Sequence, residues 1–475
     1  MLPILFKITI FMTLSILIRK TSKSKRAIWI ARGFAFSAAL CVVFSAFVMW
    51  ATPKISLPLP SGKFKIALSH MVLKTDRPEP YTLNPTDTRK LHIKIWYPTA
   101  DISGTEFTYY KPVPKHAAYA SPSMSDVHAK TISSYGPLSM LRPRLKTRLA
   151  QARLSAYAGS APLQTTEKFP ILFFSPGHRA HLDYFSTTMQ DIASHGYIVV
   201  GINHSYEPPV SILPTGETYM RTDTALENAP ALSTHDYVKY EERLQHNYGI
   251  IEQYTSNKQY TEHEERFFSA YSTIINTPQD LTQDLPIRVA DMLSAFSFLE
   301  TNIEKQNPSA LFSIMDISKI GTFGMSFGGP TSAEFCRIYK KCLAIANIDG
   351  KNWGNMLKEP LDVPMLWIAG SYTDNERFDI PYALNHWRAD AFRVFIPGVT
   401  HQAFTDAPFL SPVLNLALID MRYILKPGHH NAQVHKITNG ALVQLFDHYI
   451  KGQPFNLTQL ENELAQVRVE EYHKK

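Results

Sequence analysis

The stretch that decides the fold is Ile320-Gly-Thr-Phe-Gly-Met-Ser-Phe-Gly-Gly-Pro330. It contains Gly324-Met325-Ser326-Phe327-Gly328, which has the nucleophile-elbow pattern G-x-S-x-G. Residues Ile317–Phe323 predict a short β-strand before the serine, and Pro330–Lys340 predict a helix after it. A serine at such a sharp turn has strained backbone angles, and glycines two positions away provide the space. The pattern therefore predicts a nucleophilic serine at a helix N-terminus, where N–H groups can hold an oxyanion.

Short apolar runs that predict buried strands alternate with helical stretches on both sides of this motif. In chain order they are strand Ile171–Phe174, helix Tyr184–His195, strand Tyr197–Ile202, helix Arg288–Glu304, the elbow strand, strands Cys342–Ile348, Pro364–Ala369 and Phe392–Ile396, and helix Thr438–Ile450. This alternation predicts an α/β fold with a mostly parallel central sheet and helices on both faces.

A serine nucleophile needs a base that takes its proton and an acid that orients the base. In folds with this elbow the chain order is serine, acid, histidine. His401 follows strand Phe392–Ile396 through Pro-Gly-Val-Thr, which places it at the carboxyl edge of the sheet. Asp349 and Asp374 each follow one of the two preceding strands, and spacing alone does not decide which of them is the acid.

A second oxyanion donor is expected in the loop Ser175-Pro176-Gly177-His178, which follows the strand Ile171–Phe174. Glycine lets a backbone N–H approach a substrate oxygen closely. The N–H of His178 would then pair with the N–H of Phe327, the residue after the nucleophile.

Two apolar runs open the chain. Leu2–Ile18 has 17 residues but includes Lys7, whereas Gly33–Thr52 has 20 residues without a charge. At ~1.5 Å per residue the second run matches the ~30 Å hydrocarbon core of a bilayer. The basic residues within Arg19–Arg32 predict a cytoplasmic segment between the runs. Whether one or both runs span stays open, but either arrangement puts the main domain on the extracytoplasmic side, periplasmic or lumenal.

These features divide the chain into three parts. We expect a membrane anchor of one or two helices at residues 1–56, a hydrolase domain at residues 57–460, and a C-terminal tail at residues 461–475. Within the domain, insertions are expected at about 100–165, loop-rich with one basic helix, and at about 205–285, as a cap or lid over the site.

Composition argues against several other classes. The net charge is +7 and the pI is near 9.0, but basic residues are scattered and no basic stripe lies near the serine, so no nucleic-acid partner is expected. Cys41 lies in the apolar N-terminal segment, which leaves one possible cysteine pair and no disulfide framework. His429, His430 and His435 lack carboxylate or thiolate neighbours and are expected at the surface. No metal or cofactor is predicted.

Five segments together resemble the plasma-type platelet-activating-factor acetylhydrolases, also called lipoprotein-associated phospholipases A2. The segments are Leu91–Pro98, Lys168–Gly177, Asp191–His204, Asp316–Gly329 and Gly398–Asp406. The likeness spans roughly residues 57–455, with weak patches at the two insertions.

The resemblance implies an α/β-hydrolase fold and metal-independent ester hydrolysis. It implies Asp349 as the acid in preference to Asp374, and it puts the family's oxyanion residues on His178 and Phe327. Met325 and Pro176 stand where the family commonly has histidine, which changes the pocket walls and not the required chemistry.

The sequence thus favours a membrane-anchored serine esterase or lipase with Ser326, Asp349 and His401 as its triad. The resemblance extends this to lipids with short or oxidised acyl chains. One alternative is a general carboxylesterase, or a cutinase-like polyester hydrolase, that uses Asp374. A further alternative is a non-catalytic binding module on a hydrolase scaffold.

Overall fold

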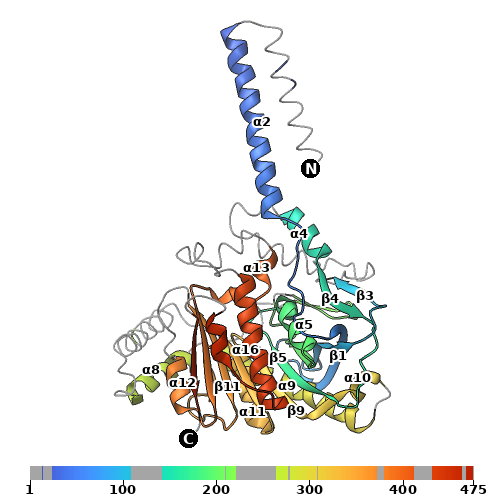
Figure 1. The fold of residues 1–475 in the computed structure, drawn as a ribbon, viewed down its shortest axis with the longest axis vertical. Coiled ribbons are helices and arrows are strands. Elements are labelled where there is room, and N and C mark those ends of the chain that lie inside the picture. The colour runs from blue at the N-terminus through green and yellow to red at the C-terminus, as the bar shows by residue number, and fades with distance from the viewer. Residues whose placement is uncertain are drawn as a thin grey trace.

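The computed structural model of the protein describes residues 24–108, 142–208, 210–220, 264–276, 279–306, 309–371, 379–410, 431–462 and 467–473, with single residues at 13, 16 and 246. One long helix, α2 (Lys25–Ala51), projects from an α/β domain that contains the rest of the described chain (Figure 1).

The centre of the domain is one sheet with eleven strands among the described residues, in the order β13-β12-β11-β10-β9-β5-β6-β2-β1-β4-β3. The neighbours from β12 to β6 in this order run parallel, and β13 and β2 flank them in antiparallel pairing. The strands are β1 (Lys65–Pro78), β2 (Thr88–Thr99), β3 (Thr105–Thr108), β4 (Arg153–Ala158), β5 (Phe169–Ser175), β6 (Ile198–Asn203), β9 (Met315–Met325), β10 (Ala344–Ile348), β11 (Met365–Ser371), β12 (Ala391–Pro397) and β13 (Arg468–Tyr472). A separate hairpin pairs β7 (Val210–Ile212) with β8 (Thr218–Met220).

Helices cover both faces of the sheet. The described helices and 3-10 turns of the domain are α4 (Arg142–Gln151), η3 (Leu182–Phe185), α5 (Ser186–Ser194), α8 (Glu264–Asn276), α9 (Gln279–Glu304), α10 (Ala310–Ser313), α11 (Gly328–Tyr339), α12 (Asp379–His386), η4 (His401–Phe404), α13 (Ala407–Leu410), α16 (Asn431–Lys451) and η5 (Leu457–Asn462). The predicted α/β fold with a mostly parallel sheet is therefore confirmed.

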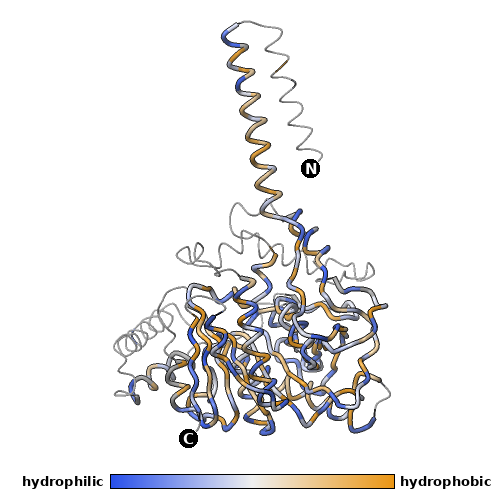
Figure 2. Tube along the Cα trace, viewed as in Figure 1, coloured by the Kyte–Doolittle hydropathy of each residue, from blue (hydrophilic) through white to orange (hydrophobic). Residues whose placement is uncertain are grey.

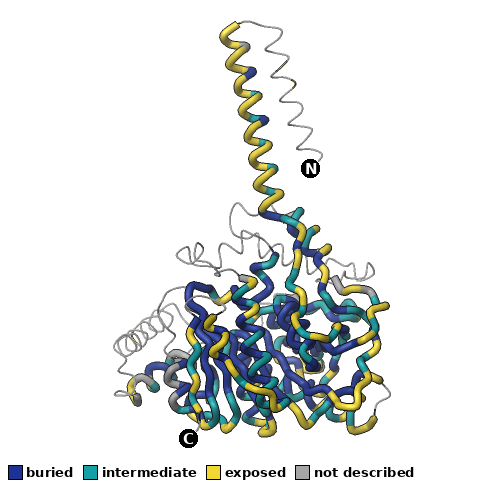
Figure 3. The backbone as a smooth tube through the Cα atoms, in the orientation of Figure 1, coloured by how far each residue is buried: buried dark blue, intermediate teal, exposed yellow. Residues whose placement is uncertain are grey.

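Two hydrophobic cores lie on opposite faces of the sheet because side chains alternate along each strand. In β5, Ile171 and Phe173 pack into the core under α9, α11 and α12, whereas Leu172 and Phe174 pack into the core under α5 and α16. All four side chains are fully buried, as Figure 3 shows for the central strands. An apolar residue at every position of a central strand therefore reflects burial on both faces.

Helix α9 is longer than its sequence pattern suggested. The helical period is clear from Arg288, but the helix begins at Gln279 and continues through Pro286. Pro286 lies beyond the first turn of the helix, so α9 lacks one backbone N–H donor at that position. The earlier start brings Asp284 onto the same element as Arg288.

A disulfide joins Cys336 of α11 to Cys342, with the two Cα atoms 5.5 Å apart. Between them Lys340 caps the helix in the left-handed conformation, φ +61°, so that the chain reverses toward β10 within a few residues. This is the one possible cysteine pair that the sequence left, and the sharp reversal brings its two members together.

Helix α2 is apolar along most of its length and stands clear of the domain (Figure 2). Its segment Ile28–Ala51 is the one helix, among the described residues, that is long and apolar enough to cross a bilayer. Large apolar side chains on it are exposed, among them Trp29, Phe36 and Val43. The predicted run Leu2–Ile18 lies outside the described residues apart from two isolated positions.

The one basic helix expected within residues 100–165 is α4. Its apolar residues Leu145 and Leu149 are buried, and the Arg148 Nε atom donates to the carbonyl of Thr52 at 3.4 Å. This contact ties the helix to the residue that follows α2. Most of the second insertion, at 205–285, lies outside the described residues.

Residues 461–475, expected as a tail, contribute the sheet strand β13. It pairs antiparallel with β12, for example Val394 with Val469. The segment is thus part of the sheet at the edge next to β12.

The disulfide generates a stability prediction. Closing a loop of this size by a cross-link reduces the entropy of the unfolded chain, so the Cys336→Ala/Cys342→Ala variant should lose about 2 kcal/mol of stability. Thermal unfolding of the detergent-solubilised full chain measures the loss. Dithiothreitol should lower the midpoint of the wild type to that of the variant and leave the variant unchanged. Cys41→Ala is the control, and a wild-type midpoint that matches the variant without reductant would contradict the prediction.

Candidate active site

Ser326 occupies a bend between β9 and α11 that glycines keep open. Its φ of +56° lies in the left-handed region, which strains a residue with a side chain. Its backbone N–H donates to the carbonyl of Ile348 at 2.7 Å. A Cβ at Gly328 would lie 1.8 Å from the carbonyl oxygen of Ser175, and one at Gly324 would lie 2.1 Å from the backbone of Gly328. Only glycine fits at these two positions.

Asp349 and His401 form a direct hydrogen bond. Asp349 follows β10 and also has a positive φ, +51°. Its Oδ2 atom lies 2.5 Å from Nδ1 of His401, and its Oδ1 atom accepts from the backbone N–H of Gly370 at 3.1 Å. Because Nδ1 donates to the carboxylate, the lone pair of the imidazole lies on Nε2, the nitrogen that can accept a proton. The carboxylate is nearly buried, whereas the imidazole is 42 % exposed and accessible to a substrate.

The strand register brings Ser326 and Asp349 to one edge of the sheet. Met325 of β9 pairs with Ile348 of β10, so Ser326 and Asp349, the residues that follow them, lie at the same level of the sheet. A Cβ at Gly350 would lie 2.0 Å from the carbonyl oxygen of Ser326, which shows how closely the two loops pack. The turn η4 after β12 then brings His401 onto Asp349. Asp374, the alternative acid, lies outside the described residues.

The loop after β5 packs directly against the serine. A Cβ at Gly177 would lie 3.2 Å from the Cβ of Ser326, so this side of the loop faces the nucleophile. The carbonyl of Gly177 accepts from the N–H of Ala180 at 3.1 Å, which closes a tight turn. The imidazole of His178 meets the ring of Phe327 edge-on, with centroids 5.8 Å apart. The two residues predicted as oxyanion donors are therefore neighbours.

The turn that carries His401 is anchored to the start of α5. The N–H of Asp406 donates to the carbonyl of Tyr184 at 2.7 Å, and its carboxylate accepts from both the N–H and the hydroxyl of Thr187. The same hydroxyl lies 2.9 Å from Nε2 of His435. His435, expected at the surface, is instead half-buried, and burial lowers its pKa to about 4. His429 and His430 lie outside the described residues.

A buried polar network that was not predicted from the sequence lies behind the loop after β5. Helix α9 presents Asp284, Arg288 and Asp291, spaced so that all three lie on one helix face. His204, which follows β6, lies between Asp291 and Ser175, with Nδ1 2.8 Å from the carboxylate and Nε2 3.0 Å from the hydroxyl. The helical spacing of the three polar residues of α9 was the one sign of this network in the sequence. It could not reveal their partners, which are distant in the sequence.

Charge compensation holds this network together. Burial alone would raise the pKa of Asp291, but the charge and hydrogen bonds of Arg89 and the hydrogen bond of His204 lower it well below the usual range. Arg89 binds Asp291 through two nitrogens, at 3.0 and 2.7 Å, and Glu79 through a third, at 2.9 Å. Burial and the charge of Arg288 lower the pKa of His204 to about 3, so this histidine is neutral at physiological pH.

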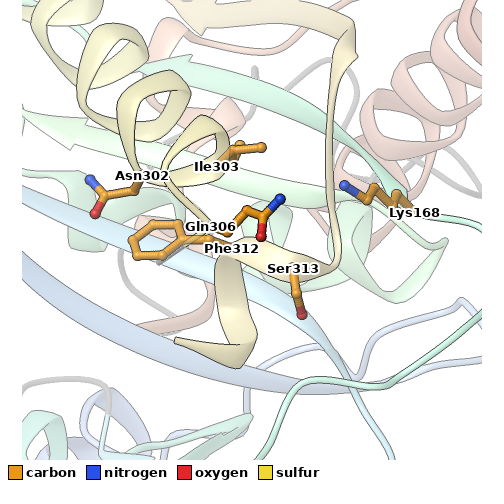
Figure 4. Close-up of a pocket in the computed structure, with 6 residues that line it drawn as sticks. All are labelled: Lys168, Asn302, Ile303, Gln306, Phe312 and Ser313. Carbon is orange, nitrogen blue, oxygen red and sulfur yellow. The ribbon is translucent and has the colours of Figure 1, made fainter. Parts of the chain in front are cut away.

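A cavity of about 350 Å³ lies elsewhere in the domain (Figure 4). Its lining comprises Lys168, Asn302, Ile303, Gln306, Phe312 and Ser313. Lys168 precedes β5 and Ser313 precedes β9, so the cavity lies at the amino ends of these strands. Ser326 is at the opposite edge, and the cavity is not part of the candidate active site.

The described residues contain no group of three or more histidine, cysteine, aspartate or glutamate side chains arranged to bind a metal ion. The chemistry of a serine, a histidine and an aspartate requires no such ion.

Two curated relatives are similar to part of the chain, and both are named platelet-activating factor acetylhydrolase. The protein from Cavia porcellus is 26 % identical over 198 residues, which is 41 % of this chain and 38 % of the relative. The protein from Canis lupus familiaris is 25 % identical over 261 residues, which is 53 % of this chain and 51 % of the relative. The matched region thus spans about half or less of each relative.

One solved structure with the same fold is a ferulic acid esterase from Streptomyces cinnamoneus. It superimposes with a TM-score of 0.57, and the match covers 85 % of this chain and 96 % of the esterase at 17 % identity. At this identity the match establishes the fold.

A sequence model of one family matches residues 56–453, most of the chain. The family is described as platelet-activating factor acetylhydrolase, isoform II. The resemblance inferred from the five sequence segments is confirmed, and this chain belongs to the platelet-activating factor acetylhydrolase family.

Proposed function

We propose that this protein is a serine hydrolase of carboxylic esters, with Ser326, His401 and Asp349 as its triad. The observation that carries the proposal is the 2.5 Å hydrogen bond between His401 and Asp349, at the sheet edge where Ser326 has a strained backbone. Family membership and the fold of the ferulic acid esterase support the same reaction class.

The residues act in two half-reactions. His401 Nε2 takes the hydroxyl proton of Ser326 as Oγ attacks the ester carbonyl, and Asp349 stabilises the resulting imidazolium. The N–H groups of His178 and Phe327 stabilise the oxyanion of the tetrahedral intermediate. The ester C–O bond then breaks, and the leaving alcohol takes the proton from the imidazolium. Water, activated by the same imidazole, attacks the acyl-enzyme and releases the carboxylic acid.

The two relatives support one substrate class. Two proteins named platelet-activating factor acetylhydrolase match part of the chain, which supports lipid esters with short or oxidised acyl chains as substrates. The rival within enzymes is a general carboxylesterase, or a polyester hydrolase, that uses Asp374. A non-catalytic binding module is disfavoured because the serine, the histidine and the acid are all present in the chain.

Substitutions in the triad test the reaction and the choice of acid. Ser326→Ala should abolish hydrolysis of p-nitrophenyl butyrate, and Asp349→Asn should lower kcat by about ten-thousand-fold because the imidazole loses its orienting charge. The matched control Asp374→Asn should stay within about threefold of wild type. Initial rates of the purified full chain measure these effects.

The results separate the rivals. A large loss in Asp374→Asn with an active Asp349→Asn would favour the carboxylesterase with the other acid. If a fluorophosphonate probe does not label Ser326 in the folded wild-type protein, the result would favour the binding module. Relative rates on a short-acyl phospholipid and on p-nitrophenyl esters decide the substrate class.

We further propose that α2 anchors the protein in a membrane, with the catalytic domain on the extracytoplasmic side. Exposed Trp29, Phe36 and Val43 would be costly in water but favourable in lipid. Positive charge before the helix supports a cytoplasmic start. The disulfide supports the same side for the domain, because such bonds persist in oxidising compartments.

Membrane extraction tests the anchor. Phe36→Lys/Val43→Lys should move the protein from the pellet to the supernatant after alkaline carbonate treatment, since charges in a span oppose insertion. Leu59→Lys/Leu83→Lys, which changes exposed apolar residues outside α2, is the control and should stay in the pellet. Trypsin added to spheroplasts should digest the domain if it is extracytoplasmic, and a protected domain would contradict the proposed side.

A further inference from the structure

The loop after β5 is held from behind by the polar face of α9. We propose that this face, through Arg288 and through Asp291 with His204, positions the peptide groups of the loop for oxyanion binding. The inference rests on the proposed function and deepens it by adding positioning residues. We call Arg288, Asp291, His204 and Ser175 the α9 brace.

Arg288 holds the loop directly. Its Nη2 atom donates to the carbonyl of Pro176 at 2.6 Å and lies 3.5 Å from that of Gly177. Its guanidinium stacks 5.1 Å from the ring of Phe327, so one side chain contacts both halves of the proposed oxyanion site. Glu207 Oε1 lies 3.4 Å from Nε, and both side chains are buried. Burial raises the pKa of Glu207 to about 7, and the charge of Arg288 opposes that rise.

The geometry of the peptide group means that contacts to the carbonyls of Pro176 and Gly177 also orient the N–H groups of Gly177 and His178. A trans peptide holds its C=O and N–H on opposite sides of one plane. With the carbonyl of Pro176 turned toward the guanidinium, the N–H of Gly177 points the other way. The carbonyl of Gly177 faces the N–H of Ala180 at 3.1 Å and Nη2 of Arg288 at 3.5 Å, which turns the N–H of His178 away from the guanidinium. A Cβ at Gly177 would lie 3.2 Å from the Cβ of Ser326, so the nucleophile borders this part of the loop.

The second arm of the brace fixes the point where the loop leaves the sheet. Ser175 Oγ lies 3.0 Å from Nε2 of His204, and Nδ1 of His204 lies 2.8 Å from Asp291. The three residues have the order of a catalytic triad, but their side chains are completely or almost completely buried, so no substrate reaches them. Asp291 fixes the proton on Nδ1, and Ser175 donates to Nε2.

The third polar residue of the same helix face reaches the last residue of the loop. Asp284 accepts from the hydroxyl of Tyr81 at 2.6 Å and lies 3.3 Å from Nε2 of His178. Asp284 and Arg288 thus contact loop positions 178 and 176, and Asp291 reaches position 175 through His204. One rigid helix face therefore sets the position of the whole loop relative to Ser326.

Two conservative variants test the brace. Ser175→Ala removes only the donor to His204, and Arg288→Lys keeps the charge but loses the planar fork. We expect kcat to fall by about tenfold or more in each variant, with KM within about threefold of wild type. The hydrogen bonds from the loop to the substrate oxygen strengthen as negative charge develops on that oxygen in the transition state, so a misplaced loop lowers kcat more than it changes KM. The inhibition constant of an aryl trifluoromethyl ketone, whose serine adduct carries the oxyanion, should rise by the same factor as kcat/KM falls. Because burial keeps the pKa of His204 at about 3, the titration of His204 itself should add no pH dependence to the loss in Ser175→Ala between about pH 6 and about pH 9.

Matched controls change equally buried polar residues that do not touch the loop. Thr322→Val removes a buried hydrogen bond on the neighbouring strand β9, and Arg393→Lys changes a buried arginine paired with Glu470. Both should keep kcat within about threefold of wild type, whatever their effect on the unfolding midpoint. Comparison of these controls with the brace variants distinguishes a positioning role of the α9 brace from a general loss of stability.

The outcomes are distinct. If folded Ser175→Ala and Arg288→Lys keep the wild-type kcat while Ser326→Ala is inactive, the positioning role of the α9 brace is wrong and the proposed function stands. Equal losses in the control variants also overturn the positioning role. An active Ser326→Ala overturns the proposed function itself. If Arg288→Lys does not fold, Ser175→Ala decides alone.

Discussion

Backbone crowding where β5, β9 and β10 end is the constraint on which the rest of the structure depends. The carbonyl of Ser175 occupies the space where a side chain of Gly328 would lie, and the N–H of Ser326 is held by the carbonyl of Ile348. Three consecutive strands of the sheet are therefore locked together at one level. The strained serine backbone persists because its neighbours leave it no relaxed alternative.

Local sequence carried enough information to predict this sheet edge. Strands buried on both faces are uninterrupted apolar runs, and the elbow glycines are required by contacts within a few residues, so both leave a local signature. His401 was predicted from its place after a strand. Spacing did not distinguish Asp349 from Asp374 as the acid of the triad, so the choice of Asp349 came from family resemblance. Only the folded chain shows its hydrogen bond to His401.

The polar network behind the loop could not be predicted because its members come together only in the tertiary structure. Arg89 lies 202 residues and His204 lies 87 residues before Asp291, and each alone resembles an ordinary surface residue. Apolar side chains of equal volume would fill this space, but they would not fix the rotation of a peptide plane. Hydrogen bonds in a buried network supply that direction, at the cost of desolvating the ions.

Strand β13 has a consequence for the integrity of the sheet as a whole. It occupies the outer side of β12, the strand that leads to His401, so the unpaired N–H and C=O groups of that strand are not available to another molecule. The strand itself carries the charged residues Arg468, Glu470 and Glu471, and charged residues on an edge strand discourage edge-to-edge association between copies of the chain. Strand β13 thus shields the outer edge of β12 from association with another chain, and a variant without residues Arg468–Tyr472 would expose that edge.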